Sequence, residues 1–293
     1  MDLDIVHCRN VRPVSSLPPF RQPSEWQHQI HVGDCRAVLP RLPAGSVHLV
    51  LTSPPYAEAR AATYGGISEA EYGAWFLPIA AEMARVLHPQ GSLILNLKEG
   101  ITSQSERSTY VMELILALRQ AGWLWREEYI WHKTAVFPGL FGPRLKDGWE
   151  RLLHFSRERD IRFFPDTVRQ PVKTDPRTWW GADWPAGKIQ DPITKSGLTV
   201  DRHRICQKNP GTALPSNVIM CRPATGHTRH PAQMPETLPR FFVSLMTQEN
   251  DVVLDPFSGS GTTCEVAARM HRVPVGIELH AEYVRPLPPR PML

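Results

Sequence analysis

The segment DVVLDPFSGSGTTCEVAARMHRVPVGIEL (251–279) constrains the fold more than any other part of the chain. It consists of an apolar run, a glycine-rich turn, a stretch with helical spacing and a second apolar run. Two consecutive strands joined through a helix run parallel to each other in one sheet. The segment therefore predicts an α/β protein with a largely parallel sheet.

The glycine-rich turn DPFSGSGTT (255–263) favours a bound cofactor. Gly259 and Gly261 allow the backbone to approach a ligand closely, and the following helix begins with free N–H groups. No lysine follows the last glycine, as a Walker phosphate loop requires, and Cys264 replaces the third glycine of a dinucleotide loop. Glu278 ends the next strand, where an acidic side chain binds a ribose hydroxyl in doubly wound sheets. A tight turn and a surface glutamate remain the alternative for this segment alone.

A second polar turn, TSPPY (52–56), also follows an apolar run. Two prolines fix the backbone and remove two N–H donors, which leaves carbonyl groups free to accept hydrogen bonds. Ser53 adds a hydroxyl and Tyr56 a flat ring. Rigid acceptors beside an aromatic ring suit a planar base that carries an amine. Taken alone, however, two prolines after a strand favour an ordinary connecting loop.

The remaining elements follow from hydrophobic periodicity. Ser68 is expected to cap a helix over 67–89, with Glu71 three residues further on and Pro89 at its end. No helical or strand period is sustained from about 158 to 229, which predicts an irregular region. The other expected elements are strands within 28–35, 46–56, 91–97, 124–133 and 150–157, one or two helical turns at 36–42, and helices at 110–123 and 234–246.

Basic residues are concentrated in this irregular region. Residues 151–230 contain 14 Lys and Arg against 7 Asp and Glu, within a chain whose formal net charge is only +4. Such a segment indicates a surface for a polyanion, although a solvated basic face would have the same composition.

The cysteines and the apolar runs exclude several classes of protein. The 5 cysteines are scattered without a Cys-x-x-Cys pair, which argues against a zinc site and a disulfide framework and fits a reducing cytoplasm. No apolar run reaches the roughly 20 residues that a membrane span needs, and no signal peptide is recognised at the N-terminus.

The two turns together resemble the catalytic and cofactor motifs of the DNA amino-methyltransferases, which modify adenine N6 or cytosine N4. The catalytic motif comes first, the basic segment second and the cofactor motif last, which resembles the permuted β subgroup common in restriction–modification systems. RHPAQMPETLPRFF (229–242) resembles the helix that closes over the methionine end of the cofactor, GIE (276–278) the ribose motif, and GDC (33–35) the loop that contacts the cofactor adenine.

This resemblance implies a Rossmann-like, doubly wound, mostly parallel sheet of the S-adenosylmethionine-dependent methyltransferase type with an inserted target-recognition region. The implied domains are an N-terminal arm (1–28), a catalytic domain (29–157 and 229–284), the target-recognition region (158–228) and a C-terminal tail (285–293). The implied catalytic residues are Ser53, Pro54, Pro55 and Tyr56. The implied cofactor-binding residues are Asp34, Cys35, Thr52, His230, Pro231, Asp255, Pro256, Phe257, Ser258, Gly259, Ser260, Gly261, Thr262, Thr263 and Glu278.

The implied reaction is direct in-line transfer of a methyl group from S-adenosyl-L-methionine to an exocyclic amine of a flipped-out base, without a metal or a covalent intermediate. Ser53 Oγ and the Pro54 carbonyl would accept the two amine hydrogens, and Tyr56 would stack on the base. Serine at the first motif position favours cytosine N4 over adenine N6, which stays the alternative. Cytosine C5 methylation is disfavoured, since no Pro-Cys pair occurs in the chain.

The implied partner is double-stranded DNA with a short specific recognition sequence, in the cytoplasm of a bacterial or archaeal cell, at the nucleoid. A separate cognate restriction endonuclease and both a monomer and a homodimer stay open. The rival hypotheses are an RNA methyltransferase and a nucleic-acid-binding module without catalysis. A fused endonuclease is disfavoured, because the 293 residues leave little room for a nuclease domain.

Overall fold

The computed structural model describes residues 18–58, 66–102, 105–136, 144–171, 188–190, 199–201, 212–224 and 233–289. The chain divides into two compact units, one of residues Met1–Phe164 with Asn217–Leu293 and one of residues Pro165–Ser216. The first unit contains the predicted motifs that the structure describes, so it is the unit that positions the site.

An eight-stranded sheet forms the centre of the first unit, in the order β1-β12-β11-β2-β3-β5-β4-β10. Neighbouring strands are parallel except at β5, which is antiparallel to both β3 and β4. The carboxyl ends of the other strands and the amino end of β5 therefore lie at one edge of the sheet. In sheet order the strands are β1 (Gln29–Val32), β12 (Val273–Glu278), β11 (Val252–Asp255), β2 (Val47–Thr52), β3 (Leu87–Leu97), β5 (Trp149–Ser156), β4 (Leu124–Lys133) and β10 (Val218–Cys221).

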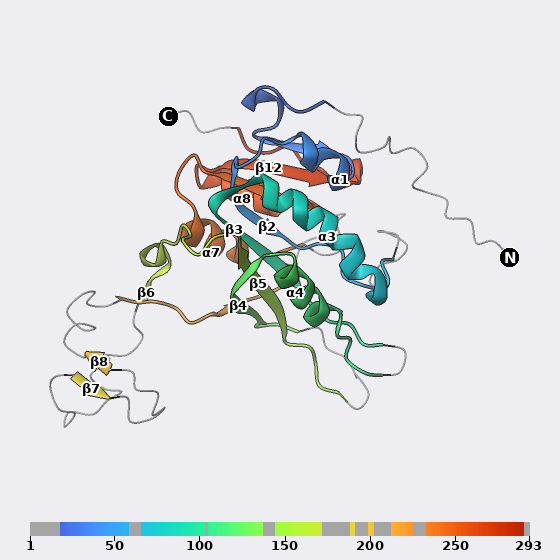
Figure 1. The fold of residues 1–293 in the computed structure, drawn as a ribbon. Helices are drawn as coiled ribbons and strands as arrows, with labels where there is room; N and C mark the ends of the chain where they lie inside the picture. The colour runs from blue at the N-terminus through green and yellow to red at the C-terminus, as the bar shows by residue number, and fades with distance from the viewer. Residues whose placement is uncertain are drawn as a thin grey trace. The chain divides into compact units, whose positions relative to one another are not determined.

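Helices cover both faces of this sheet (Figure 1). One side carries α1 (Cys35–Val38), α3 (Glu69–Val86) and α4 (Tyr110–Gln120), and the other carries α7 (Thr237–Met246) and α8 (Thr262–Arg269). The unit β2-α3-β3 steps along the sheet in one direction and β11-α8-β12 in the other, so right-handed crossovers place their helices on opposite faces. The sheet thus has a topological switch point between β11 and β2, which is where open α/β sheets bind ligands. Among the described helices, none combines the length and the apolar character that a bilayer span requires.

The predicted fold class is confirmed, and the predicted cap of α3 is confirmed as well, since Ser68 Oγ accepts from the Glu71 N–H at 3.3 Å. The helix was expected to include Leu87, with Pro89 after its end, and the strand to begin only at 91. The helix ends at Val86, and β3 begins at Leu87, because Leu87 already pairs with Val47 of β2 ahead of a register shift. Pairing with a distant strand therefore overrides the local helical period.

The region predicted to be irregular, from about 158 to 229, contributes one strand to the large sheet. Residues 218–221 form β10, which pairs in parallel with Ile130–Lys133 of β4. The four residues VIMC show no alternation long enough to predict a strand. Their strand conformation depends on the edge that β4 offers, which is a contact between segments far apart in the sequence.

The second unit contains two small antiparallel pairs among its described residues. One joins β6 (Gln170–Pro171) to β9 (Thr212–Ala213), and the other joins β7 (Lys188–Gln190) to β8 (Thr199–Asp201). Arg169 donates to Thr212 Oγ1 and to the Thr212 carbonyl, each at 3.1 Å, and holds the first pair together. The recognition role of this region stays a prediction.

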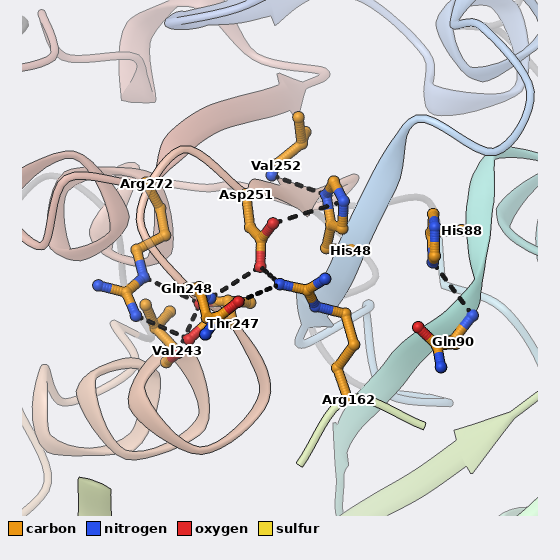
Figure 2. A network of polar contacts seen from close by, with 10 residues as sticks. All are labelled: His48, His88, Gln90, Arg162, Val243, Thr247, Gln248, Asp251, Val252 and Arg272. Atoms are coloured by element: carbon orange, nitrogen blue, oxygen red, sulfur yellow. Dashed lines mark hydrogen bonds and ion pairs between the residues drawn. The ribbon is translucent and has the colours of Figure 1, made fainter. Parts of the chain in front are cut away.

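A polar network closes the amino end of the sheet (Figure 2). Asp251 precedes β11, and its Oδ2 accepts from Arg162 at 2.6 Å and from the Gln248 N–H at 2.7 Å. His48 Nδ1 accepts from the Val252 N–H at 3.1 Å, and its Nε2 lies 3.4 Å from Asp251 Oδ1. Burial lowers the pKa of His48, so the neutral imidazole turns its single N–H toward the carboxylate. The network ties β2, β11, the turn after α7 and the segment around Arg162 into one body.

Candidate active site

The strands on either side of the switch point end in a buried polar pair. Thr52 ends β2 and donates to Asp255 Oδ1 at 2.6 Å, and the same oxygen accepts from the Phe257 N–H at 3.1 Å. Asp255 is 4% exposed, and this burial raises its pKa to about 6. The carboxylate is therefore held in a fixed orientation at the point where β11 enters the glycine-rich turn.

The glycine-rich turn adopts a backbone conformation that residues with a Cβ rarely adopt. Gly259 and Gly261 have φ angles of 55° and 85°, both in the left-handed region. A Cβ on Gly261 would also lie 2.8 Å from Ile30 Cδ1. The turn therefore packs tightly against β1 and leads directly into α8.

Glu278 at the end of β12 supports this turn from the side. Its Oε2 accepts from the Gly259 N–H at 2.7 Å, and its Oε1 accepts from the His280 N–H at 2.9 Å. The side chain is 4% exposed. Glu278 thus fixes the turn, while each carboxylate oxygen retains a second lone pair for a ligand hydroxyl.

The GDC loop (33–35) lies beside Glu278, although more than 240 residues separate them in the sequence. Val32 pairs with Glu278, and the Gly33 N–H donates to the Glu278 carbonyl at 2.8 Å. Asp34 caps α1 by accepting from the Arg36 N–H at 2.8 Å. Cys35 is buried, and burial raises the pKa of its thiol to about 12, which leaves a neutral thiol at physiological pH.

These three segments fit an adenosine-type cofactor. They combine a glycine turn with two left-handed residues, an acidic side chain at the neighbouring strand end and a helix start, all at the carboxyl edge of the sheet. His230 and Pro231 lie outside the described residues, so the structure does not place them. The nearest described part of their segment, Gln233, donates to Thr262 Oγ1 at the start of α8 at 3.0 Å.

The TSPPY turn leaves β2 on the other side of the switch point. Ser53 Oγ donates to the Tyr56 hydroxyl at 3.4 Å, a long hydrogen bond, and the Tyr56 hydroxyl donates to Glu150 Oε2 at 2.8 Å. Burial and the nearby Glu150 carboxylate raise the pKa of Tyr56 well above its usual value, so its hydroxyl stays protonated. The Pro55 carbonyl accepts from the Tyr72 hydroxyl at 2.8 Å. The role of the Pro54 carbonyl as an acceptor stays a prediction.

Sequence reasoning missed three residues that surround this turn. Glu150 begins β5 and is 8% exposed, and its Oε1 accepts from Lys133 Nζ of β4 at 2.6 Å. Asn96 of β3 donates to Glu150 Oε2 at 3.0 Å. The only signal in the sequence is a Glu-Arg pair near the start of a strand whose later residues are mostly apolar. Its meaning depends on the reversed direction of β5, which brings the start of that strand to the carboxyl edge of its neighbours.

A cofactor-type glycine turn at the switch point, beside a turn of rigid acceptors on the adjacent strand, defines a Rossmann-like group-transfer enzyme. The family can be named from the sequence as a whole. A family model described as DNA methylase, of the N6 and N4 type, matches residues 47–287. The chain therefore belongs to this DNA methylase family, and the recognition of the two motifs is confirmed.

Two curated relatives cover most of the chain. The type II methyltransferase M.PvuII of Proteus hauseri is 27% identical, and the match covers 87% of this chain and 81% of the relative. The type II methyltransferase M.BglII of Bacillus subtilis is 28% identical, with 91% of this chain and 69% of the relative covered.

Solved structures agree on the fold. The cytosine-N4-specific PvuII DNA methyltransferase superposes with a TM-score of 0.64 at 23% identity, covering 87% of this chain and 83% of its own. A Thermus thermophilus protein proposed to be a DNA modification methylase, in complex with S-adenosyl-L-methionine, gives a TM-score of 0.58 at 27% identity. That match covers 87% of this chain and 89% of the Thermus chain.

Proposed function

We propose that this DNA methylase transfers the methyl group of S-adenosyl-L-methionine to the N4 amine of a cytosine in duplex DNA. One observation carries the proposal: the Ser53-Pro54-Pro55-Tyr56 turn leaves β2 directly beside the glycine-rich turn that leaves β11. Amine acceptors and cofactor cradle thus occupy adjacent strand ends. The names of two similar proteins support the target and the donor, since one is cytosine-N4-specific and the other is a complex with S-adenosyl-L-methionine.

The residues at the end of β2 have the chemistry that an exocyclic amine requires. The lone pair of such an amine is delocalised into the base, so the site has to draw that density back onto nitrogen. Ser53 Oγ and the Pro54 carbonyl accept the two amine hydrogens, and Tyr56 presents its ring to the face of the base. The two prolines keep these groups from moving, so little reorganisation accompanies the reaction.

The residues at the ends of β11, β12 and β1 hold the cofactor. Glu278 and the GDC loop lie where a ribose and an adenine would bind, and Asp255, Gly259 and Gly261 form the turn beneath them. When bound there, S-adenosyl-L-methionine supplies a methyl group on a positively charged sulfur. That the transfer needs no metal stays a prediction.

The DNA target has to leave the duplex to reach this edge of the sheet, since its amine is otherwise paired. The basic region around the second unit has the charge to bind DNA phosphates. It lies in the chain between the catalytic and cofactor motifs, where we expect the residues that recognise a short DNA sequence. The type II relatives suggest a restriction–modification context, with a cognate endonuclease as a separate protein.

The product of the reaction tests the proposal. The protein is incubated with labelled S-adenosyl-L-methionine and duplex DNA of mixed sequence, and the DNA is digested to nucleosides for mass spectrometry. N4-methyldeoxycytidine is the expected product. N6-methyldeoxyadenosine would retain the enzyme class and overturn the cytosine target, and methylation of an RNA duplex alone would overturn DNA as the substrate.

A further inference from the structure

Glu150 is a buried carboxylate that the proposed transfer does not use, yet it lies one hydrogen bond away from the TSPPY turn. Three donors on three different elements surround it: the Tyr56 hydroxyl, Asn96 Nδ2 and Lys133 Nζ. An ion pair alone would explain Lys133. It would not explain why the carboxylate also binds the hydroxyl of the ring that is to stack on the base.

The direction of these hydrogen bonds follows from the chemistry of the groups. An ionised carboxylate only accepts, so the single hydrogen of the Tyr56 hydroxyl has to point at Glu150. The Tyr56 oxygen is then available only as an acceptor toward Ser53, and Ser53 Oγ lies 3.4 Å from it. The hydroxyl hydrogen of Ser53 is thereby drawn toward Tyr56, and the lone pairs of Ser53 remain for another donor.

A serine hydroxyl that is free to rotate can offer either its hydrogen or its lone pairs. Only the lone pairs can accept a hydrogen from the target amine. We propose that Glu150 is a positioning residue which, through Tyr56, orients the Ser53 hydroxyl as an acceptor for the amine. This inference rests on the proposed function of Ser53 and extends it to a residue on β5.

Lys133 and Asn96 hold the Glu150 carboxylate in the orientation in which it accepts from Tyr56. The Lys133 ammonium lies 2.6 Å from Oε1 and balances the buried negative charge, and Asn96 shares Oε2 with Tyr56. The side chains of Lys133 and Glu150 are 16% and 10% exposed, so water screens their pairing only weakly. The carboxylate is therefore paired with a cation and held in a fixed orientation.

Replacing Glu150 by glutamine tests the direction of the hydrogen bonds. In E150Q the amide oxygen should stay with the Lys133 cation, because that bond is charge-assisted, and the amide NH₂ then faces Tyr56. Asn96 Nδ2 loses its bond to position 150 and keeps its bond to the Arg151 carbonyl at 3.2 Å. Tyr56 has to accept from this NH₂ and turns its own hydrogen toward Ser53. The hydroxyl hydrogen of Ser53 then points at the substrate, and we expect single-turnover methylation to slow by about 10- to 100-fold.

Removing the Tyr56 hydroxyl from E150Q should partly restore its methylation rate. Y56F keeps the ring and breaks the connection to Glu150, so Ser53 rotates freely and methylation slows by only about 3- to 5-fold. The double variant Y56F/E150Q should be as fast as Y56F and faster than E150Q. A double variant as slow as E150Q, or one in which the two losses multiply, would overturn the proposal.

Glu99 provides the matched control, because it is a buried glutamate paired with Arg151 and has no contact with Tyr56. The effect of E99Q on the rate should be the same with and without Y56F. The methylated nucleoside formed by the unmodified protein is identified in the same assay. This identification tests the proposed target base separately from the comparison of the rates of E150Q, Y56F and the double variant. Urea unfolding of the unmodified protein, E150Q, Y56F and the double variant should show coupling between positions 56 and 150. An absence of coupling would overturn the proposal whether or not any DNA is methylated.

Discussion

Strand β11 has an aspartate at each end, and the two carboxylates differ in what surrounds them. Asp251, before the strand, has both oxygens engaged by Arg162, the Gln248 N–H and His48 (Figure 2). Asp255, at the end of the strand, has no cationic partner among the described residues, accepts from Thr52 and from the Phe257 N–H, and has a pKa raised by burial to about 6.

The difference indicates that the amino edge of the sheet contributes mainly to stability and the carboxyl edge mainly to function. At the amino edge the Asp251 carboxylate is paired with Arg162 and hydrogen-bonded, so this edge contributes to the stability of the fold. At the carboxyl edge, burial of Asp255 without a balancing cation among the described residues costs free energy, and Glu278 keeps lone pairs for a ligand hydroxyl. Residues at the carboxyl edge should therefore affect methylation, and residues at the amino edge should affect unfolding.

The largest expected effect is on methylation, from S53A at the carboxyl end of β2. Loss of an acceptor for the amine should slow single-turnover methylation by about 100- to 1000-fold and leave the urea midpoint nearly unchanged. S46A, at the other end of the same strand, removes a hydroxyl that bonds the Pro43 carbonyl at 2.7 Å and is the matched control. Equal rates for the two variants would break the comparison.

The next effect is on stability, from R162M at the amino edge. Removing the guanidinium leaves Asp251 without its cation, which should lower the free energy of unfolding by about 3 kcal/mol. The methylation rate per folded molecule should change little. R119M, on the exposed face of α4, is the control and should change stability by less than about 0.5 kcal/mol. A loss of methylation without a loss of stability in R162M would contradict the division between the two edges.

The third prediction concerns pH. The pKa of Asp255 is higher in the folded chain, at about 6, than the ordinary value of 3.8. As pH rises from about 4 to about 6, the unfolded chain releases this proton first, so folding becomes less favourable. The free energy of unfolding of the unmodified protein should therefore fall by about 2–3 kcal/mol relative to D255N across this range and stay constant above it. If the free energies of unfolding of the two proteins depended on pH in the same way, the pKa of Asp255 would not be raised by folding.

The smallest expected effect comes from G261A in the cofactor turn. Its positive φ and the close approach to Ile30 should together cost about 1–2 kcal/mol of stability and weaken cofactor binding in calorimetry. Gly45 has a φ of 66° with no atom within 4 Å of an added Cβ, so G45A reports the backbone cost alone. If the two variants lost equal stability and bound the cofactor equally, the close packing against β1 would be irrelevant.

The sequence by itself determined the fold class and the two motifs. The glycine turn, the Ser-Pro-Pro-Tyr turn and the strand-helix-strand pattern around each are local, because backbone conformation and hydrophobic periodicity depend on near neighbours. The same locality explains why β4 and the Ser68 cap were predicted correctly. Boundaries that depend on pairing, such as the start of β3 at Leu87, were predicted less well.

Only the tertiary structure decided which residues meet at the sheet edge. The antiparallel direction of β5 brings Glu150 to Tyr56 across 94 positions of sequence, and the pairing of β1 with β12 brings the GDC loop to Glu278. The same applies to β10, whose four residues become a strand only beside β4. These contacts depend on the order and direction of the strands. Order and direction arise when the whole sheet is buried between its helices, so they cannot be predicted from the sequence of any single segment.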